Sequence, residues 1–387
     1  MGTASVTFGA GSLEKVFWER GIFVLSIAID ATAACTPKPT GIGRYTEGLT
    51  AALSQRAIRL KIGTRYSHFH QRNHRLQISD SKRFWIQEPI WPLVQGVDVL
   101  HVTDARVPRW PLLKKGTPKV ATLHDVFHIL PEFQNGGQYA TEEFTRKKID
   151  RYRQIARECD RIICVSEKTR TDFMKHVDCD PQKVEVVHHG IDSHFLEESR
   201  GNDAEILESL GIPQGGILYV GDVSARKNLQ GIVEGYLAAN LDQDHPLLLV
   251  GESTFGSGEL EFRIRQAGDR ILRIGWQKQE ILAAIYRQSR ALLFCTHYEG
   301  FGLPVLESMA CGTPVVISRS GATPEVAGGH GHLCDPADVK SIAAALKSAL
   351  NSSKDDIRAG RDHARRFTWE HCARETEAVY QRAMEVH

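Results

Sequence analysis

Short apolar runs recur along the chain, and most of them end on polar residues. They lie at Ile22–Ile29, Val97–Val102, Lys119–Leu123, Asp160–Val165 and Lys183–Val187 in the first half, and at Ile217–Val220, 245–251, Arg270–Gly275, Ala291–Cys295 and 314–318 in the second. Such runs predict strands buried on both faces, as in a parallel sheet. Helical patterns lie between them, among them Thr141–Cys159 and Gln279–Arg287. This alternation predicts an α/β fold with parallel sheets.

The length of 387 residues suggests two domains, and the hydrophobic content of 42% is enough for two cores. We expect a first domain over residues 1–192, a linker over 193–214 and a second domain over 215–368. Residues 369–387 carry a final amphipathic helical pattern. In an open α/β sheet, ligands bind in the crevice at the carboxyl ends of the strands, so polar residues there are the functional candidates.

The segment from His297 to Val316 has the pattern turn, helix, strand, and it follows a buried strand. The amides of Gly302 and Leu303 would point into the crevice, where free N–H groups at a helix start bind phosphate. Two carboxylates, Glu299 and Glu307, frame this turn. A short anion-binding turn flanked by acids suits a ligand that is both a phosphate and a polyol, such as a nucleotide sugar.

The two acids and their flanks resemble a known family. Glu299 is followed by GFGLP, seven residues separate it from Glu307, and ACGTPVV follows the second acid. This pattern, which includes Gly300 and Phe301, resembles the donor-site signature of the retaining glycosyltransferases of family 4. The resemblance implies the GT-B fold, in which two Rossmann-like domains face each other across a cleft. It also implies that the last helix crosses back to the first domain.

A pair of cations, Arg226 and Lys227, stands at a strand-to-helix junction, with Asn228 as the predicted helix N-cap. Two cations beside free helix N–H groups suit a diphosphate leaving group, although an isolated pair of this kind also suits a solvent-facing surface. The resemblance favours the first interpretation and assigns both cations to the donor diphosphate. Some family members have a basic residue where this chain has Asp222, which lowers the positive charge expected there.

The stretch TPKPTGIGRYTEGLTAAL follows the first strand. We predict a loop that leads through Gly41 and Gly43 into an amphipathic helix, because glycine lets the backbone approach a ligand closely. An ordinary flexible loop is the alternative. The resemblance implies that the loop closes over the donor diphosphate.

Polar residues end two strands of the first half, and such residues line the crevice of an α/β protein. His124 and Asp125 follow one of these strands and precede VFHILPEF. A lone histidine at this position would be structural. The two residues together resemble the acceptor-domain motif of the family, which implies that His124 approaches the transferred sugar and that Asp125 acts as base or orients the acceptor. Family members often have Asn where this chain has His189.

Charge and cysteine usage narrow the classes of function. Lys and Arg number 48 against 47 Asp and Glu, so the net charge of +1 gives no general attraction to nucleic acid or acidic membranes. None of the eight cysteines forms a CxxC pair, and we expect free, buried thiols in a reducing cytoplasm. The apolar run before Asp30 is far shorter than the about 20 residues of a membrane span and lacks the layout of a signal peptide. No acidic pair of the DxD type ends a strand, so we expect neither a metal nor another cofactor.

Two basic stretches have open interpretations. Residues 65–95 combine Arg and His with aromatics, and the helical pattern Thr141–Cys159 carries six cations. Either stretch suits contact with lipid headgroups or a lipid-linked acceptor. Stretches of this kind are more often a solvated surface. They are the basis for expecting peripheral contact with the inner membrane surface.

The resemblance therefore implies a cytoplasmic, metal-independent glycosyltransferase. TGIGRY, HDVFHILPEF and ARKN most resemble bacterial mannosyltransferases of surface-polysaccharide assembly, which favours GDP-mannose as donor and a glycan or lipid-linked oligosaccharide as acceptor. In this scheme Arg226, Lys227 and the turn amides stabilise the leaving diphosphate, Glu307 binds the ribose, and Glu299 lies by the sugar. A UDP-glucose-dependent glucosyltransferase, a sucrose-type synthase, a nucleotide-sugar epimerase and a non-catalytic sugar-nucleotide sensor are the alternatives.

Overall fold

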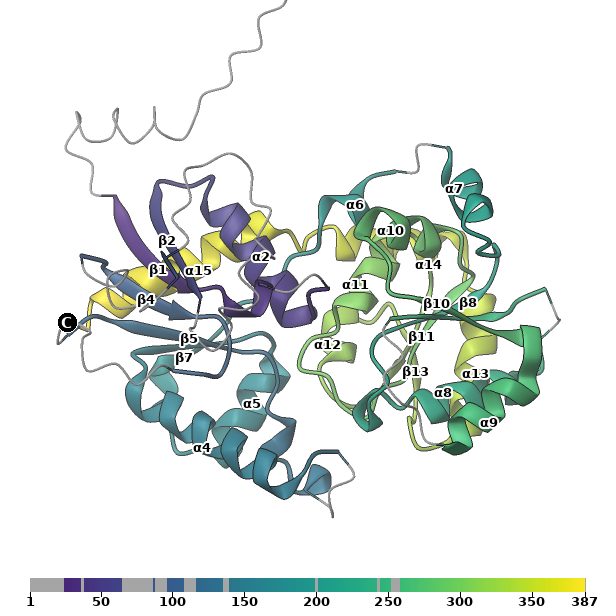
Figure 1. The fold of residues 1–387 in the computed structure, drawn as a ribbon, viewed down its shortest axis with the longest axis horizontal. Coiled ribbons are helices and arrows are strands. Elements are labelled where there is room, and N and C mark those ends of the chain that lie inside the picture. Colours follow the sequence, from purple (N-terminus) through teal and green to yellow (C-terminus); the bar gives the residue numbers. More distant parts are fainter. Residues whose placement is uncertain are drawn as a thin grey trace, which may run out of the picture.

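The computed structural model describes residues 24–35, 38–64, 86–87, 96–107, 116–134, 139–198, 201–241, 244–251 and 258–386. Figure 1 shows two lobes side by side, each built on one sheet. The interpretation of the basic, aromatic stretch 65–95 lies outside the described residues except for 86–87, and it stays a prediction.

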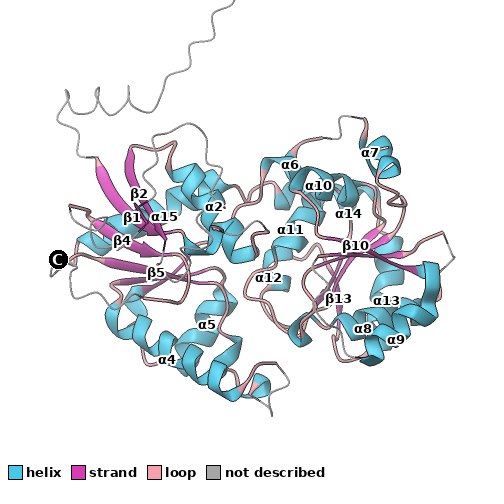
Figure 2. Cartoon of the chain, in the orientation of Figure 1, coloured by secondary structure: helices cyan, strands magenta, loops and turns pink. Residues whose placement is uncertain are grey.

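The first lobe contains a parallel sheet of seven described strands in the order β3-β2-β1-β4-β5-β6-β7. The strands are β1 (Leu25–Asp30), β2 (Ile58–Thr64), β3 (Ile86–Gln87), β4 (Val99–Val102), β5 (Lys119–Leu123), β6 (Arg161–Cys164) and β7 (Val184–Val186). All six residues of the central β1 are buried, as a parallel strand covered on both faces requires. Helices α4 (Glu142–Glu158) and α5 (Glu167–His176) cover one face, and α2 (Gly41–Leu53) covers the other (Figure 2).

The second lobe contains a parallel sheet of six described strands in the order β10-β9-β8-β11-β12-β13. The strands are β8 (Ile217–Val220), β9 (Leu247–Val250), β10 (Ile271–Gly275), β11 (Ala291–Phe294), β12 (Val315–Ser318) and β13 (His332–Cys334). Helices α8 (Leu229–Ala239), α9 (Gly258–Ala267) and α13 (Val339–Leu350) pack on one face. Helices α7 (Asp203–Ser209), α10 (Gln279–Arg287), α11 (Leu303–Ala310), α12 (Thr323–Ala327) and α14 (Lys354–Ala364) pack on the other.

The chain passes between the lobes twice. The short helix α6 (Ser193–Leu196) follows the first lobe, and α15 (Trp369–Met384) returns to it, as Figure 1 shows in yellow. The two passages touch, because Ile191 and Thr368 form an isolated parallel bridge. The face of α15 with Val379 and Tyr380 completes the core of the first lobe. This arrangement confirms the predicted GT-B fold, including the final helix that crosses back.

The carboxyl ends of the central strands in both sheets carry the loops that meet between the lobes. The loops after β8 and β11 come from the second lobe, and the loop after β5 comes from the first. All eight cysteines lie in the described part of the chain; none is paired, and six are buried. Within the described ranges, no helix is long and apolar enough to cross a bilayer.

Candidate active site

The predicted cations and the first predicted acid lie together. Arg226 Nη1 lies 2.7 Å from Glu299 Oε1, and Lys227 Nζ lies 2.9 Å from the same oxygen. All three side chains are at most 18% exposed. Aromatic rings support the cations, since Arg226 lies over Phe127 at 5.3 Å and Lys227 over Phe294 at 5.1 Å. The structure thus joins two segments that are about 70 residues apart in sequence into one charged cluster.

Backbone contacts fix the loop that carries these cations. The loop ends in a 3-10 turn over Ala225–Lys227, and Asn228 follows with φ of 55°. Asn228 stands before α8, as predicted, but its amide donates to the carbonyl oxygens of Cys295 (2.9 Å) and Pro336 (2.7 Å) instead of capping the helix. Arg226 Nη1 also donates to the carbonyl oxygen of Tyr298 at 2.8 Å. The cations are therefore held against the turn that contains Glu299.

The pKa values of Glu299 and Arg226 are shifted by the opposite charges beside them. Burial alone raises the pKa of Glu299, but Arg226 and Lys227 outweigh that effect and hold the pKa below its usual value. Burial lowers the pKa of Arg226, but the carboxylates of Glu299, Asp125 and Asp222 together raise it by more, so the net pKa lies above the ordinary value. Glu299 and Arg226 are therefore both charged at neutral pH. With one carboxylate and two cations, the cluster retains a net positive charge for an anionic ligand.

The glycine turn after Glu299 docks on the first lobe. The carbonyl oxygen of Gly300 accepts hydrogen bonds from Ser166 Oγ (2.7 Å) and Thr169 Oγ1 (3.1 Å) at the start of α5. A Cβ atom at Gly300 would lie 1.9 Å from the carbonyl oxygen of His124, so only glycine permits this approach. Gly302 then adopts φ of 109° at the N-cap of α11, and Leu303 is the first residue of that helix. The amide of Leu303 accordingly lies at a helix N-terminus, as predicted.

His124 and Asp125 come from the first lobe to this same contact. The Nε2 atom of His124 lies 2.7 Å from the carbonyl oxygen of Thr103, whereas its buried Nδ1 atom has no hydrogen-bond partner in the described part of the chain. Burial lowers the pKa of His124, so its imidazole is neutral at pH 7. The backbone of Asp125 also contacts Gly300, since its Cα would lie 2.9 Å from the same added Cβ. The structure thus brings the three predicted catalytic residues to the two sides of one turn.

A second imidazole, His189, lies beside His124. Its ring is 4.6 Å from the ring of Phe301, 4.7 Å from Tyr45 and 5.2 Å from His124. Neither ring nitrogen of His189 has a hydrogen-bond partner among the described residues, and burial lowers its pKa well below the usual value. One sequence signal marked this residue, because His189 stands where members of the resembled family often have asparagine.

The second predicted acid, Glu307, is fully buried in α11 and already has partners. Tyr286 donates its hydroxyl to Oε2 at 3.0 Å, and the Nη2 atom of Arg44 contacts Oε1. Arg44 belongs to α2 in the first lobe, so this ion pair joins the lobes. Sequence reasoning missed Arg44, although it lies inside the TGIGRY motif that drew attention to the adjacent glycines.

The expectation of a glycine-rich loop at Gly41 and Gly43 was wrong. Both residues belong to the first turn of α2, which begins at Gly41 after Thr40. Gly43 faces the preceding segment, and a Cβ there would lie 2.6 Å from the carbonyl oxygen of Ala33. Close packing therefore explains Gly43. Gly41 has open space around its Cβ position, and its role in donor binding stays a prediction.

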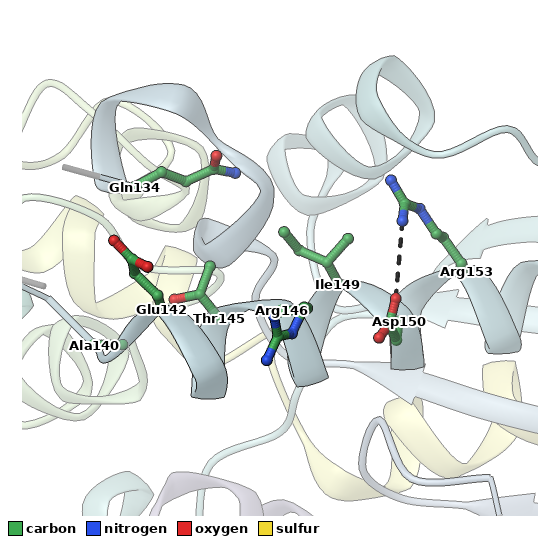
Figure 3. A pocket seen from close by; sticks show the side chains of 8 residues that line it. All are labelled: Gln134, Ala140, Glu142, Thr145, Arg146, Ile149, Asp150 and Arg153. Carbon is green, nitrogen blue, oxygen red and sulfur yellow. Dashed lines mark ion pairs between the residues drawn. The ribbon is translucent and has the colours of Figure 1, made fainter. Parts of the chain in front are cut away.

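The basic helix α4 packs on the His124–Asp125 loop, since Tyr152 donates its hydroxyl to the carbonyl oxygen of Asp125 at 3.2 Å. A hollow of about 310 Å³ lies along this helix. Arg146 and Arg153 alternate there with Glu142 and Asp150 (Figure 3). Arg153 lies 3.8 Å from Asp150. The charges here are mixed, as on a solvated helix face. Contact of α4 with a membrane or an acceptor stays a prediction.

Two parallel-sheet lobes, with a cationic loop and a glycine turn of one lobe facing a histidine and an aspartate of the other, have the GT-B architecture. Two family descriptions match the chain, and together they cover both lobes. Residues 39–195 match "Glycosyltransferase Family 4", and residues 204–366 match "Glycosyl transferases group 1". The chain belongs to these glycosyltransferases, as the sequence motifs predicted.

Named relatives include bacterial mannosyltransferases. The chain is 31% identical over 228 residues to O-antigen chain mannosyltransferase B of Escherichia coli, covering 57% of this chain and 60% of that protein. It is 28% identical over 292 residues to the MMP alpha-(1->4)-mannosyltransferase of Mycolicibacterium hassiacum, covering 70% and 67%. The matches therefore span about two thirds of these relatives or less. Sucrose-phosphate synthase of Thermosynechococcus elongatus has the same fold, with a TM-score of 0.70 at 21% identity over 94% of this chain and 100% of that one.

Proposed function

We propose that this chain is a retaining, metal-independent glycosyltransferase that moves mannose from GDP-mannose to a hydroxyl group of a glycan or lipid-linked oligosaccharide. The observation that carries the proposal is the cluster of Arg226, Lys227 and Glu299, which faces His124 and Asp125 across the turn at Gly300. The site combines cations that can bind a diphosphate with two polar residues of the opposite lobe.

These cations act on the leaving group. As the bond between the anomeric carbon and the diphosphate breaks, negative charge accumulates on the phosphate oxygens, and Arg226, Lys227 and the amides at the start of α11 stabilise it. These fixed charges act where a metal ion would otherwise act. Glu299 pairs with both cations and neutralises part of their charge. When the diphosphate takes over the two cations, the Glu299 carboxylate becomes available to orient sugar hydroxyls.

The first lobe presents the acceptor. A neutral His124, whose Nδ1 has no protein partner among the described residues, has a free position for a hydroxyl of the transferred sugar. Asp125 follows it and orients the acceptor hydroxyl. The leaving phosphate accepts the acceptor's proton, so attack occurs on the face from which the diphosphate departs and configuration is retained. This scheme requires no protein nucleophile.

The names of the bacterial relatives support mannose as the sugar and a surface polysaccharide as the product. A lipid-linked acceptor would place the enzyme at the cytoplasmic face of the inner membrane.

The proposal is tested first by binding. GDP-mannose, GDP-glucose, UDP-glucose and UDP-galactose are titrated while the melting temperature is recorded, because a ligand that binds only the folded state raises it. We expect the largest rise with GDP-mannose, and no rise for a variant with both Arg226→Ala and Lys227→Ala. Transfer to a mannan acceptor, followed by NMR of the new linkage, then tests retention. A purified chain that responds to none of these donors contradicts the proposal.

A further inference from the structure

Arg44 covers the carboxylate that the proposed function assigns to the donor ribose. Its side chain is 15% exposed, whereas that of Glu307 is 0% exposed. Arg44 contacts one oxygen of Glu307, and Tyr286 donates to the other. A ribose hydroxyl therefore has no access to Glu307 until a covering group moves. Of the two covering groups, Tyr286 belongs to the same lobe as Glu307, and Arg44 belongs to the opposite lobe.

The contacts of Arg44 are those of a partly satisfied guanidinium. Within the described residues, Nη2 contacts three acceptors: Gln279 Oε1 at 3.2 Å, Asp192 Oδ2 at 3.4 Å and Glu307 Oε1. The Nε atom is buried and has no hydrogen-bond partner there. A guanidinium has five N–H donors, and buried donors in a permanent structural role are normally paired. Arg44 therefore fits a temporary occupant of this position better than a fixed structural one.

We propose that Arg44 is an internal occupant of the ribose subsite, holding Glu307 until the ribose hydroxyls of the donor bind and then withdrawing. This inference rests on the proposed function, because that function assigns Glu307 to the ribose. The guanidinium substitutes for ribose hydroxyls as the hydrogen-bond donor to Oε1. Asp192, which precedes α6, remains in reach of Arg44 after its release.

Because Arg44 lies on the opposite lobe, binding of the donor at Glu307 is coupled to breaking a contact between the lobes. Release of Glu307 requires either a new side-chain conformation of Arg44 or separation of α2 from α11. In both cases the donor binds only the fraction of molecules in which the pair is broken, and its apparent affinity falls by that fraction. The ion pair between Arg44 and Glu307 thus stabilises the contact between the lobes and weakens nucleotide binding.

The experiment compares calorimetric affinities for GMP, UMP and inorganic pyrophosphate in wild type, Arg44→Ala and Arg56→Ala. Arg56 is the matched control. It lies just after the carboxyl end of α2 and pairs with Glu377 of α15. We expect Arg44→Ala to bind the preferred mononucleotide about tenfold more tightly, since one buried charge-assisted contact no longer competes. Pyrophosphate affinity should not change, and Arg56→Ala should match wild type throughout.

Other results separate the possible failures. Unchanged or weaker mononucleotide binding by a folded Arg44→Ala chain overturns the proposal, and weaker binding of pyrophosphate as well identifies Arg44 as a phosphate ligand instead. If Arg44→Ala does not fold, Arg44→Lys serves, because its single ammonium group cannot keep all the Nη2 contacts; it should bind mononucleotide more tightly than wild type, and failure to do so overturns the proposal. A wild-type chain that binds pyrophosphate but neither mononucleotide overturns the proposed function, and this inference with it.

Discussion

Glu299 lies in the turn before α11 and Glu307 lies inside that helix, eight residues later. Both are buried carboxylates that pair with cations, but the cations come from different lobes. Glu299 pairs with Arg226 and Lys227 of its own lobe. Glu307 pairs with Arg44 of the other lobe. The first cluster therefore persists when the lobes separate, whereas the second exists only while they are closed. Under the proposed function, the cation cluster that binds the diphosphate is preassembled and the nucleoside end of the site depends on the position of the lobes.

Of the substitutions that test this difference, removal of the Glu299 carboxylate should have the largest effect on turnover. Glu299→Ala should lower kcat by about a thousandfold, because a carboxylate that orients the reacting sugar is lost. Nucleoside diphosphate affinity should be retained or slightly improved, since two cations lose their internal partner. Steady-state release of nucleoside diphosphate and calorimetry measure the two quantities. Turnover equal to wild type would remove Glu299 from the mechanism.

The cations of the same cluster come next. The double substitution Arg226→Ala with Lys227→Ala should weaken nucleoside diphosphate binding about a hundredfold, as expected for two charge-assisted contacts. Binding of the free nucleoside should change little, because the nucleoside end lies with Glu307. Calorimetry with GDP and guanosine, or UDP and uridine, checks this difference. Equal weakening of both ligands would show that the cations support the fold and do not grip phosphate.

Lowering the pH tests the region between the two acids, where His189 lies against Tyr45 and Phe301. Burial holds the pKa of His189 well below its usual value of 6.5, so the unfolded chain takes up a proton first as the pH falls. The free energy of unfolding should therefore be highest above about pH 7 and should decrease as the pH falls below 6.5. For one imidazole that stays neutral in the folded state, the decrease from pH 7 to pH 5 is about 2 kcal/mol. Urea unfolding at pH 7.5 and pH 5 should show a smaller difference for His189→Asn than for wild type. An identical difference in both chains would exclude His189 as its source.

A smaller effect on turnover is expected from a substitution that separates the lobes at Gly300. The Cβ of Gly300→Ala would meet the carbonyl oxygen of His124 at 1.9 Å, so the turn must shift away from the first lobe. We expect kcat to fall about tenfold through misplacement of the reacting groups, while nucleotide affinity stays constant. Gly258→Ala at the start of α9 is the control, because its Cβ position is open. Normal turnover of Gly300→Ala would show that this contact is not required for catalysis.

The sequence predicted the first acid cluster better than the second for a physical reason. Glu299, Arg226 and Lys227 each follow a strong apolar strand of one sheet, and the carboxyl ends of neighbouring parallel strands meet at one edge. The partner of Glu307 is 263 residues away in sequence, and only the orientation of two separate lobes brings it near. No pattern within either lobe contains that information.

The same distinction applies to the fold. The apolar runs predicted the buried strands, with ends that differ by a few residues from those observed. They did not predict β2, whose sequence IRLKIGT interrupts the apolar residues with cations, nor the three-residue edge strand β13. Edge and half-buried strands show weaker hydrophobic signals because solvent covers part of them. The helix start at Gly41 was placed too late because glycines in sequence suggest a loop, while Gly43 in fact serves close packing.

The return of α15 to the first lobe has a consequence for synthesis on the ribosome. Cys372, Val379 and Tyr380 fill the core against α2, and Tyr380 hydrogen-bonds His101 at 2.7 Å. During synthesis, the core of the first lobe therefore stays incomplete until α15 has been translated. Such a protein does not mature in the usual order from the amino end, and a chain truncated before Trp369 would leave an apolar surface for chaperones and proteases.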